Sequence, residues 1–496
     1  MSTQVDLRRF PTFQDKSAFV SCGLTDMQQS TKKHRLFYVL RLHHSKKTLR
    51  NRNGEKMMKR FRKLAATLLS TSVLLSMAAG CSKNNETSPR TKKTELTSNE
   101  TSLTVTERNN GKTPIFELAA QHPSQTMPQE ELNKAYSTFI FELMKHCSES
   151  ADGKNVLISA DSVLLALEMT AAGADGNTLD QMLQTMVPNA DHASAFQFAV
   201  DRMHSLQNDS LQIANSIWIN QADSHSVYED YLNYVERHFD ASISVIPFDD
   251  QAVNTINNWV ADKTKERITK LLDQLDSDSL MVLINAMAFD GKWQQTYEDS
   301  KVREHDFRNG NGETTTTDFL FSTESMYLYN ADATGFIKEY DDGKYAFMTI
   351  LPNDENVDIN TFVANMSADD YWEFWDSMET DCKVYTRMPE FESEYDIQLN
   401  EVLKTMGMED AFNEARADFS NMSLDPVYIS KVIHKTYINV NREGTEAAAA
   451  TAVVMEKGEI AAPEISYNVY CDRPFAYAIV DMDTGLPVFL GTVETV

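Results

Sequence analysis

The chain is poor in cysteine, with five among its 496 residues. None of them shows CxxC or metal-ligand spacing, so the sequence predicts no metal site, no cofactor and no disulfide framework. There is no internal repeat, and no serine or cysteine lies in a recognisable nucleophile elbow. A secreted hydrolase would need one of three cysteines as nucleophile and His434 as base, and this alternative has no signature to support it. The three cysteines are Cys147, Cys382 and Cys471.

Basic residues are scarce after position 80. Residues 1–80 hold 16 Lys and Arg against 4 Asp and Glu, whereas the rest of the chain holds 30 against 69, a net charge of −39. A body this acidic repels phosphate groups, which excludes nucleic acid and anionic membrane surfaces as partners.

The first residues differ from the rest. Residues 1–57 are basic and without clear periodicity, and we interpret them as an upstream extension of the reading frame, with initiation at Met57 or Met58. Residues 58–80 combine a positive start, an apolar stretch too short to span a bilayer comfortably, and the small residues 78–80, which is the pattern of a secretory signal. Cys81 follows directly. This end resembles a bacterial lipobox with Cys81 as the lipidated residue; an ordinary signal peptide is the alternative.

Residues 81–127 are rich in Ser, Thr, Asn, Lys and Glu and predict a flexible tether. A folded domain is predicted over 128–496, starting with apolar residues at helical spacing from Leu132 to Leu143. Helical stretches dominate to about residue 280. Strands are predicted at 346–351, 428–440 and 475–480, so the fold class is α+β.

The run 444–451 is made of small and β-branched residues. Four alanines favour a helix, while the residues that follow favour a strand. Such a segment suits exposure in one state and burial as a strand in another. With Glu443 before it, the run resembles the reactive-loop hinge of the serpins. The hinge residues are Gly444, Thr445, Glu446, Ala447, Ala448, Ala449, Ala450 and Thr451.

Four further stretches resemble serpin motifs in the family's order. They are residues 155–162, 285–293, 429–440, and 472–479 together with 487–491. The resemblance implies helices around a large central β-sheet, two smaller sheets and an exposed reactive-centre loop. It also implies a breach at Trp293, where the loop first enters the sheet.

The resemblance implies a shutter as well, a polar cluster where the sheet parts: Ser159, Ser162, Asn285 and His434. Buried polar groups must be hydrogen-bonded, and these four can satisfy one another in two arrangements. The sequence departs from the family at Ala160, where proline is usual, and at Asp161, whose partner the sequence does not reveal. A buried structural histidine, with no ligand or base role, is the interpretation we give His434.

A second departure is a reversal of charge. The family usually has glutamate two residues before the hinge glycine, facing a lysine after a strand proline. This chain has Arg442 at the first place and Glu390, after Pro389, at the second. We expect an inverted ion pair that holds the start of the loop, although a chance reversal of two surface charges would look the same.

The resemblance implies a suicide-substrate inhibitor and not an enzyme. A protease acylates the loop, and the loop then inserts into the sheet and traps the protease. If strand alternation holds, Thr445, Ala447, Ala449 and Thr451 face the core while Glu446 faces out. Counting from Gly444 places the scissile bond at Gly458–Glu459, with Lys457–Gly458 as the runner-up.

The expected partner is a protease. Lys457 would suit trypsin-like enzymes, Gly458 would suit elastase- or subtilisin-like ones, and a papain-like cysteine protease is the alternative. We expect a monomer that touches the membrane only through its lipid. Export across the inner membrane of a bacterium is expected, with the periplasmic and cell-surface faces both open. The competing interpretations are a non-inhibitory serpin acting as carrier or chaperone, and a surface adhesin.

Overall fold

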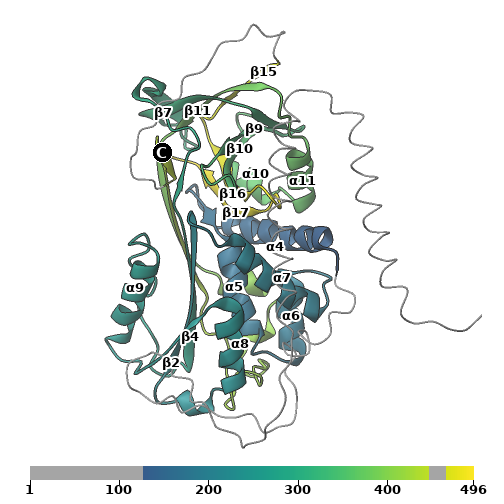
Figure 1. The fold of residues 1–496 in the computed structure, drawn as a ribbon, viewed down its shortest axis with the longest axis vertical. Coiled ribbons are helices and arrows are strands. Elements are labelled where there is room, and N and C mark those ends of the chain that lie inside the picture. Colours follow the sequence, from purple (N-terminus) through teal and green to yellow (C-terminus); the bar gives the residue numbers. More distant parts are fainter. Residues whose placement is uncertain (1–126, 446–464) are drawn as a thin grey trace, which may run out of the picture. The chain divides into compact units, whose positions relative to one another are not determined.

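The computed structural model describes residues 127–445 and 465–496. Its first helix, α4 (Gln129–Glu149), begins where the sequence predicted the folded domain to start, and its predicted apolar face is buried (Figure 1). The predictions for 1–57, 58–80, Cys81 and nearly all of the tether lie outside the described residues. Among the helices of the described ranges, none is both long enough and apolar enough to cross a membrane.

Helices dominate the first part of the domain, as predicted. The described helices after α4 are α5 (Ala160–Ala171), α6 (Gly176–Met186), α7 (His192–Leu206), α8 (Glu229–Phe239), α9 (Ala252–Lys263), α10 (Ile359–Ala364), α11 (Ala368–Asp376) and α12 (Asn400–Thr405). Several begin at side chains that cap the first turn, as at Ser159, Asp191 and Ser367.

A six-stranded sheet forms much of the core. Its order is β1 (Leu157–Ile158), β17 (Pro487–Val493), β16 (Phe475–Asp481), β10 (Tyr345–Pro352), β9 (Ala333–Glu339) and β8 (Met326–Tyr329). Every residue of β10, β16 and β17 is buried. Continuous burial explains why these strands are largely apolar instead of alternating.

A second sheet has four strands. Its order is β15 (Ser466–Tyr470), β11 (Lys383–Pro389), β7 (Thr314–Glu324) and β6 (Val302–Arg308). β15 is the first element after residues 446–464, and it pairs in parallel with β11. The sheet therefore holds the chain directly downstream of the predicted loop.

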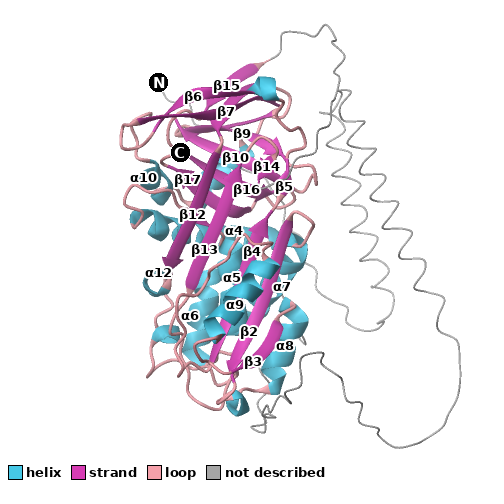
Figure 2. Cartoon of the chain, turned by 90° about the vertical axis from the view of Figure 1, so that its left-hand side faces the viewer, coloured by secondary structure: helices cyan, strands magenta, loops and turns pink. Residues whose placement is uncertain are grey.

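Two further ladders stand side by side (Figure 2). One contains β3 (Ser242–Ile246), β2 (Leu211–Asn220) and β4 (Met281–Phe289). The other contains β12 (Phe391–Gln398), β13 (Ile433–Val440), β14 (Gly444–Thr445) and β5 (Gly291–Lys292). The resemblance implied one large central sheet. Within the described residues, no ladder pairs β4 with β13, so the strands expected in that sheet form two hydrogen-bonded groups.

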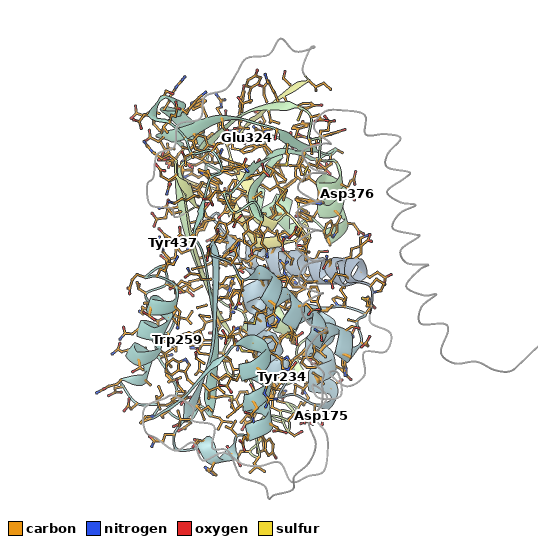
Figure 3. The ribbon with its side chains drawn as sticks, viewed as in Figure 1. Asp175, Tyr234, Trp259, Glu324, Asp376 and Tyr437 are labelled. Atoms are coloured by element: carbon orange, nitrogen blue, oxygen red, sulfur yellow. The ribbon has the colours of Figure 1, made fainter. Side chains whose placement is uncertain are left out.

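Strand alternation divides the side chains of β4 between two cores. Ile284 and Ala286 pack with Trp218 and with α9 on one face. Met287 and Phe289 join the main core on the other. Trp259 of α9 lies edge-on to Trp218, with ring centroids 6.1 Å apart (Figure 3). A helix therefore covers each face of this three-stranded ladder.

The predicted strands are largely found. β10 covers the prediction at 346–351 and β16 that at 475–480. The prediction at 428–440 was wrong for its first five residues, because β13 begins at Ile433. There the backbone bonds to helical segments and not to a neighbouring strand: the Ile429 N–H donates to the carbonyl of Ala411, in a short 3-10 helix, and the Val432 N–H donates to Oδ1 of Asn400 in α12 at 2.8 Å.

Candidate functional site

The first two hinge residues form a short strand. Gly444 and Thr445 make up β14, which pairs with β5 through Lys292 and Gly291 and with β13 through Val440. Thr445 is fully buried, and its Oγ1 lies 2.6 Å from the hydroxyl of Tyr340. The predicted alternation pointed Thr445 toward the core, and the structure places it there.

The remaining loop predictions lie outside the described residues. These are the hinge positions Glu446, Ala447, Ala448, Ala449, Ala450 and Thr451 and the scissile-bond positions Lys457, Gly458 and Glu459. Their roles stay predictions.

Trp293, predicted at the breach, secures the turn that leads into β14. It is 2% exposed and stacks on Tyr340, with ring centroids 4.7 Å apart and planes 10° from parallel. Its indole Nε1 donates to the Asn441 carbonyl at 2.8 Å, and its backbone N–H donates to the Glu443 carbonyl at 3.0 Å. The aromatic platform and these two hydrogen bonds fix the turn.

Arg442 lies in the same turn and contacts Glu390, as the reversed charges suggested. Its Nε lies 3.3 Å from Glu390 Oε1, and the same oxygen accepts the Arg442 backbone N–H at 2.9 Å. The hydrogen bond to Glu390 is the main cause that raises the pKa of Arg442 above its ordinary value. Two carboxylates that sequence reasoning missed lie further out, Asp318 at 3.5 Å and Asp299 at 3.7 Å.

An ion pair with a buried lysine lies beside this cluster. Lys338 Nζ lies 3.0 Å from Glu324 Oε1 and 4.5 Å from the ring centroid of Tyr297 (Figure 3). The backbone N–H of Tyr297 donates to the Arg442 carbonyl at 3.0 Å. Charges and aromatic rings thus surround the hinge at the breach.

The structure brings the four predicted shutter residues together. Ser159 caps α5, and its backbone N–H donates to His434 Nε2 at 3.1 Å. Its Oγ accepts the Ser162 N–H at 3.3 Å, and Ser162 Oγ donates to Asn285 Oδ1 at 2.5 Å. The first turn of α5 therefore links β13 to β4, the two strands that share no ladder in the described chain.

His434 is neutral at physiological pH. It is 3% exposed, and burial lowers its pKa from 6.5 to about 4. Because Nε2 accepts a hydrogen bond, the ring proton resides on Nδ1. The shutter is therefore a neutral hydrogen-bonded cluster.

Two shutter neighbours were missed from the sequence. Asn285 Nδ2 donates to Asn215 Oδ1 at 2.8 Å, and Asn215 donates in turn to the Phe239 carbonyl at 2.7 Å. Met287 Sδ lies 3.3 Å from Ser159 Oγ. Both residues belong to strands whose pairing partners the sequence does not show. Side chains two positions apart in a strand lie on the same face, so Met287 could have been predicted to lie on the same face of β4 as Asn285.

Asp161 has a partner that the sequence did not reveal. Both of its carboxylate oxygens accept from Arg202 of α7, at 2.8 Å from Nε and 2.9 Å from Nη2. Arg202 Nη1 also donates to Asp481 at 3.0 Å, and Tyr136 donates its hydroxyl to Asp161 at 2.9 Å. All three charged side chains are at most 2% exposed. This network fixes α5 directly beneath the shutter.

The cysteines are not arranged for catalysis in the described part of the chain. Cys147, Cys382 and Cys471 are buried free thiols, and burial raises the pKa of Cys147 to about 12. Thiols with raised pKa values are poor nucleophiles. The described residues also contain no group of three or more His, Cys, Asp or Glu side chains that could hold a metal ion.

Comparison with known proteins agrees with this geometry. A family model described as Serpin (serine protease inhibitor) matches residues 134–496. Human serpin B8 is 31% identical over 376 residues, which cover 73% of this chain and 98% of that protein. A serpin-like protein of Methanosarcina mazei is 29% identical over 378 residues, covering 73% of this chain and 87% of the relative.

Solved structures extend the agreement to the fold. The thermophilic serpin tengpin in its native state superposes with a TM-score of 0.67 at 34% identity, covering 76% of this chain and 96% of tengpin. Thyroxine-binding globulin in complex with thyroxine has a TM-score of 0.63 at 23% identity, over 74% of this chain and 99% of the globulin, which supports the fold alone. The predicted α+β serpin fold is confirmed, and the chain belongs to the serpin family, whose members are generally protease inhibitors and not catalysts.

Proposed function

We propose that this protein is a secreted, lipid-anchored inhibitor that traps a serine protease as an acyl-enzyme. One observation carries the proposal: β14 already occupies a strand position between β5 and β13. Below it, β4 and β13 share no ladder in the described chain, and the first turn of α5 links them through hydrogen bonds to His434 and Asn285. The first two hinge residues thus form the start of a strand that could be extended between β4 and β13.

The chemistry is that of an interrupted proteolysis. The protease serine attacks the Gly458 carbonyl, the bond to the Glu459 nitrogen breaks, and Gly458 becomes the acyl group on the serine. Residues from Glu446 onward then extend β14 as a new strand, each adding backbone hydrogen bonds. Small residues from Ala447 to Ala450 suit this because they bring neither bulk nor charge into the sheet. Lys457–Gly458 is the second candidate bond.

The test is a denaturing gel of residues 128–496 after brief incubation with trypsin, subtilisin, pancreatic elastase and papain. We expect a band that survives boiling, at the summed mass of protease and inhibitor less the released C-terminal peptide. Mass analysis of that peptide names the bond: a peptide beginning at Glu459 supports the first choice, and one beginning at Gly458 the runner-up. A stable band with papain alone would assign a cysteine protease as target.

A non-inhibitory role is the second candidate. The solved structure of thyroxine-binding globulin in complex with thyroxine shows that the fold can also hold a small ligand. Cleavage in the loop by all four proteases without any boiling-resistant band would contradict the inhibitory proposal and support a carrier or chaperone.

Anchoring is a separate part of the proposal, supported by residues 58–81. We expect the mature N-terminus at Cys81, and labelled palmitate in the protein that the Cys81→Ser variant does not acquire. An unmodified N-terminus after residue 80 would indicate an ordinary signal peptide. Added protease digesting the domain on intact cells would assign the cell-surface face, and protection would assign the periplasm.

A further inference from the structure

One face of the sheet β15-β11-β7-β6 is unusually aromatic. On β11, Val384, Thr386 and Met388 are buried, so the alternating residues Lys383, Tyr385 and Arg387 face outward. Strand register sets Tyr470 of β15 on one side of Arg387 and Phe321 of β7 on the other. We call this set the β11 face: Arg303, Phe321, Lys383, Tyr385, Arg387 and Tyr470.

Two large apolar side chains of this face are among the most exposed in the described chain, and a third precedes β15 directly. Tyr385 is 46% exposed, Tyr470 37% and Ile465 59%. Tyr329, Leu424 and Tyr428 are comparably exposed elsewhere in the described residues. Gathered aromatic groups of this kind mark interaction surfaces, whereas single exposed ones do not.

The charges of the β11 face have the opposite sign to those of the whole domain. Its three charged members, Arg303, Lys383 and Arg387, are basic, although residues 81–496 carry more than twice as many acidic as basic groups. Arg387 lies 4.2 Å from the ring centroid of Tyr470, and Arg303 lies 5.5 Å from that of Phe321. Asp472, just beyond β15, pairs with Arg387. Arginine and tyrosine together are the residues that most often carry interface binding energy.

The chain leading from the predicted scissile bond ends beside this face. Ser466, the first residue of β15, lies seven positions after Glu459, and an extended chain covers roughly 3.3–3.6 Å per residue. A protease held at Gly458–Glu459 therefore has its active site within about 25 Å of the start of β15. That is less than the diameter of a protease domain, so its surface beside the active site lies within reach of the β11 face.

We propose that the β11 face is a second contact surface for the target protease, and that it fits an acidic rim beside the active site with apolar pockets for tyrosine. This rests on the proposed function for the identity of the partner. Contact here adds to loop recognition, so it speeds encounter without altering whether the cut loop inserts. Opposite charge on the partner makes that encounter salt-dependent.

The experiment compares two variants with matched controls. Tyr385→Ala removes an aromatic group, and Arg303→Glu/Lys383→Glu reverses two charges. Tyr428→Ala is the aromatic control, because Tyr428 is also 46% exposed but precedes β13 in the chain and lies outside the β11 face. Lys134→Glu on α4, with a side chain 60% exposed, is the charge control.

The readout is the second-order rate constant for loss of the intact loop, with trypsin, subtilisin, pancreatic elastase and papain, at low and high salt. With the protease that attacks the wild type fastest, we expect each β11-face variant to lose about tenfold and the controls to change little. The charge-reversed variant should lose its difference at high salt. Equal rates for all variants with that protease would overturn the proposal.

The two proposals fail differently. The partition between trapped and cleaved inhibitor tests the proposed function, whereas the rate of loop consumption tests the β11 face. Suppose that the wild type is cleaved without trapping and that Tyr385→Ala is cleaved about tenfold more slowly. That result would support the β11 face as a contact surface and contradict the proposed inhibitory function. A loop that none of the four proteases attacks would overturn both.

Discussion

The breach and the shutter are held in different ways. At the breach, Arg442 lies among three carboxylates, Trp293 stacks on Tyr340, and β14 adds backbone pairing. At the shutter the contacts are neutral side-chain hydrogen bonds through Ser159 and Ser162. Exposed charges rearrange at little cost, whereas buried polar groups must exchange partners together. The breach therefore suits entry of the loop, and the shutter suits an all-or-none opening.

The largest effect should come from the charge beneath the shutter. Arg202→Met leaves Asp161 and Asp481 buried without their cation, and we expect a loss of about 3–5 kcal/mol in the free energy of unfolding. Urea denaturation measures it, with Lys134→Met as the exposed control. A loss below about 1 kcal/mol would show that charge matters no more here than it does at the surface.

The next prediction concerns pH. Burial holds the pKa of His434 at about 4 against 6.5 in the unfolded chain, so the native state binds fewer protons between these values. The stabilisation is complete above pH 6.5 and is lost as pH falls toward 4, by about 3 kcal/mol.

Other groups titrate in that range, so the measurement is a difference. In His434→Gln, whose amide oxygen can still accept the Ser159 N–H, stability should fall less steeply from pH 7 to pH 4.5 than in the wild type. If the free energy of unfolding fell equally with pH in the two proteins, His434 would not be the neutral, buried group that we infer.

A charge at the start of the hinge should separate cleavage from trapping. Thr445 is fully buried against Tyr340. Thr445→Arg places a cation there, which slows extension of β14, so we expect at least a tenfold smaller trapped fraction with normal loop cleavage. Glu446→Arg is the control, because alternation points that position outward. Equal trapping by Thr445→Arg and the wild type would contradict the role of β14 as the start of the inserting strand.

The smallest effect belongs to the exposed pair. The Arg442 side chain is 36% exposed, so its pairing with Glu390 contributes about 0.2–1 kcal/mol. Arg442→Glu should speed insertion modestly, measured as the rate of trapping. Adding Glu390→Lys should restore the rate only in part, since Asp318 and Asp299 still repel the new glutamate and lysine cannot accept the backbone N–H. If Glu390→Lys restored none of the trapping rate, the Arg442–Glu390 pair would not control loop insertion.

Sequence reasoning located the fold and most of the contacts that motifs encode. The hinge, Trp293 and the four shutter residues lie within recognisable stretches, and the Arg442–Glu390 contact followed from two charges reversed together. The contacts that it missed join residues that are far apart along the chain. Asp161 meets Arg202 after 41 residues and Arg202 meets Asp481 after 279, and no local pattern joins them.

Pairing between strands was equally hidden. The apolar pattern of β4 and β13 does not reveal that the two strands share no ladder, nor that the first turn of α5 bonds to both of them. The start of β13 was misplaced for a related reason, because residues 428–432 are apolar enough for a strand but their backbone bonds to Ala411 and to Asn400 of α12.

The last described segment, residues 465–496, contributes β15, β16 and β17, and two of these are buried along their whole length. β16 lies between β10 and β17, and β17 pairs in turn with β1 near the start of the domain. A chain interrupted between 446 and 464 would consist of two polypeptides that share one core. Neither piece could bury its apolar strands alone, so the two should associate as complementing fragments and denature as a unit. Covalent continuity at the loop is therefore dispensable for cohesion, and the protein could be divided here into two co-expressed fragments, one long and one short.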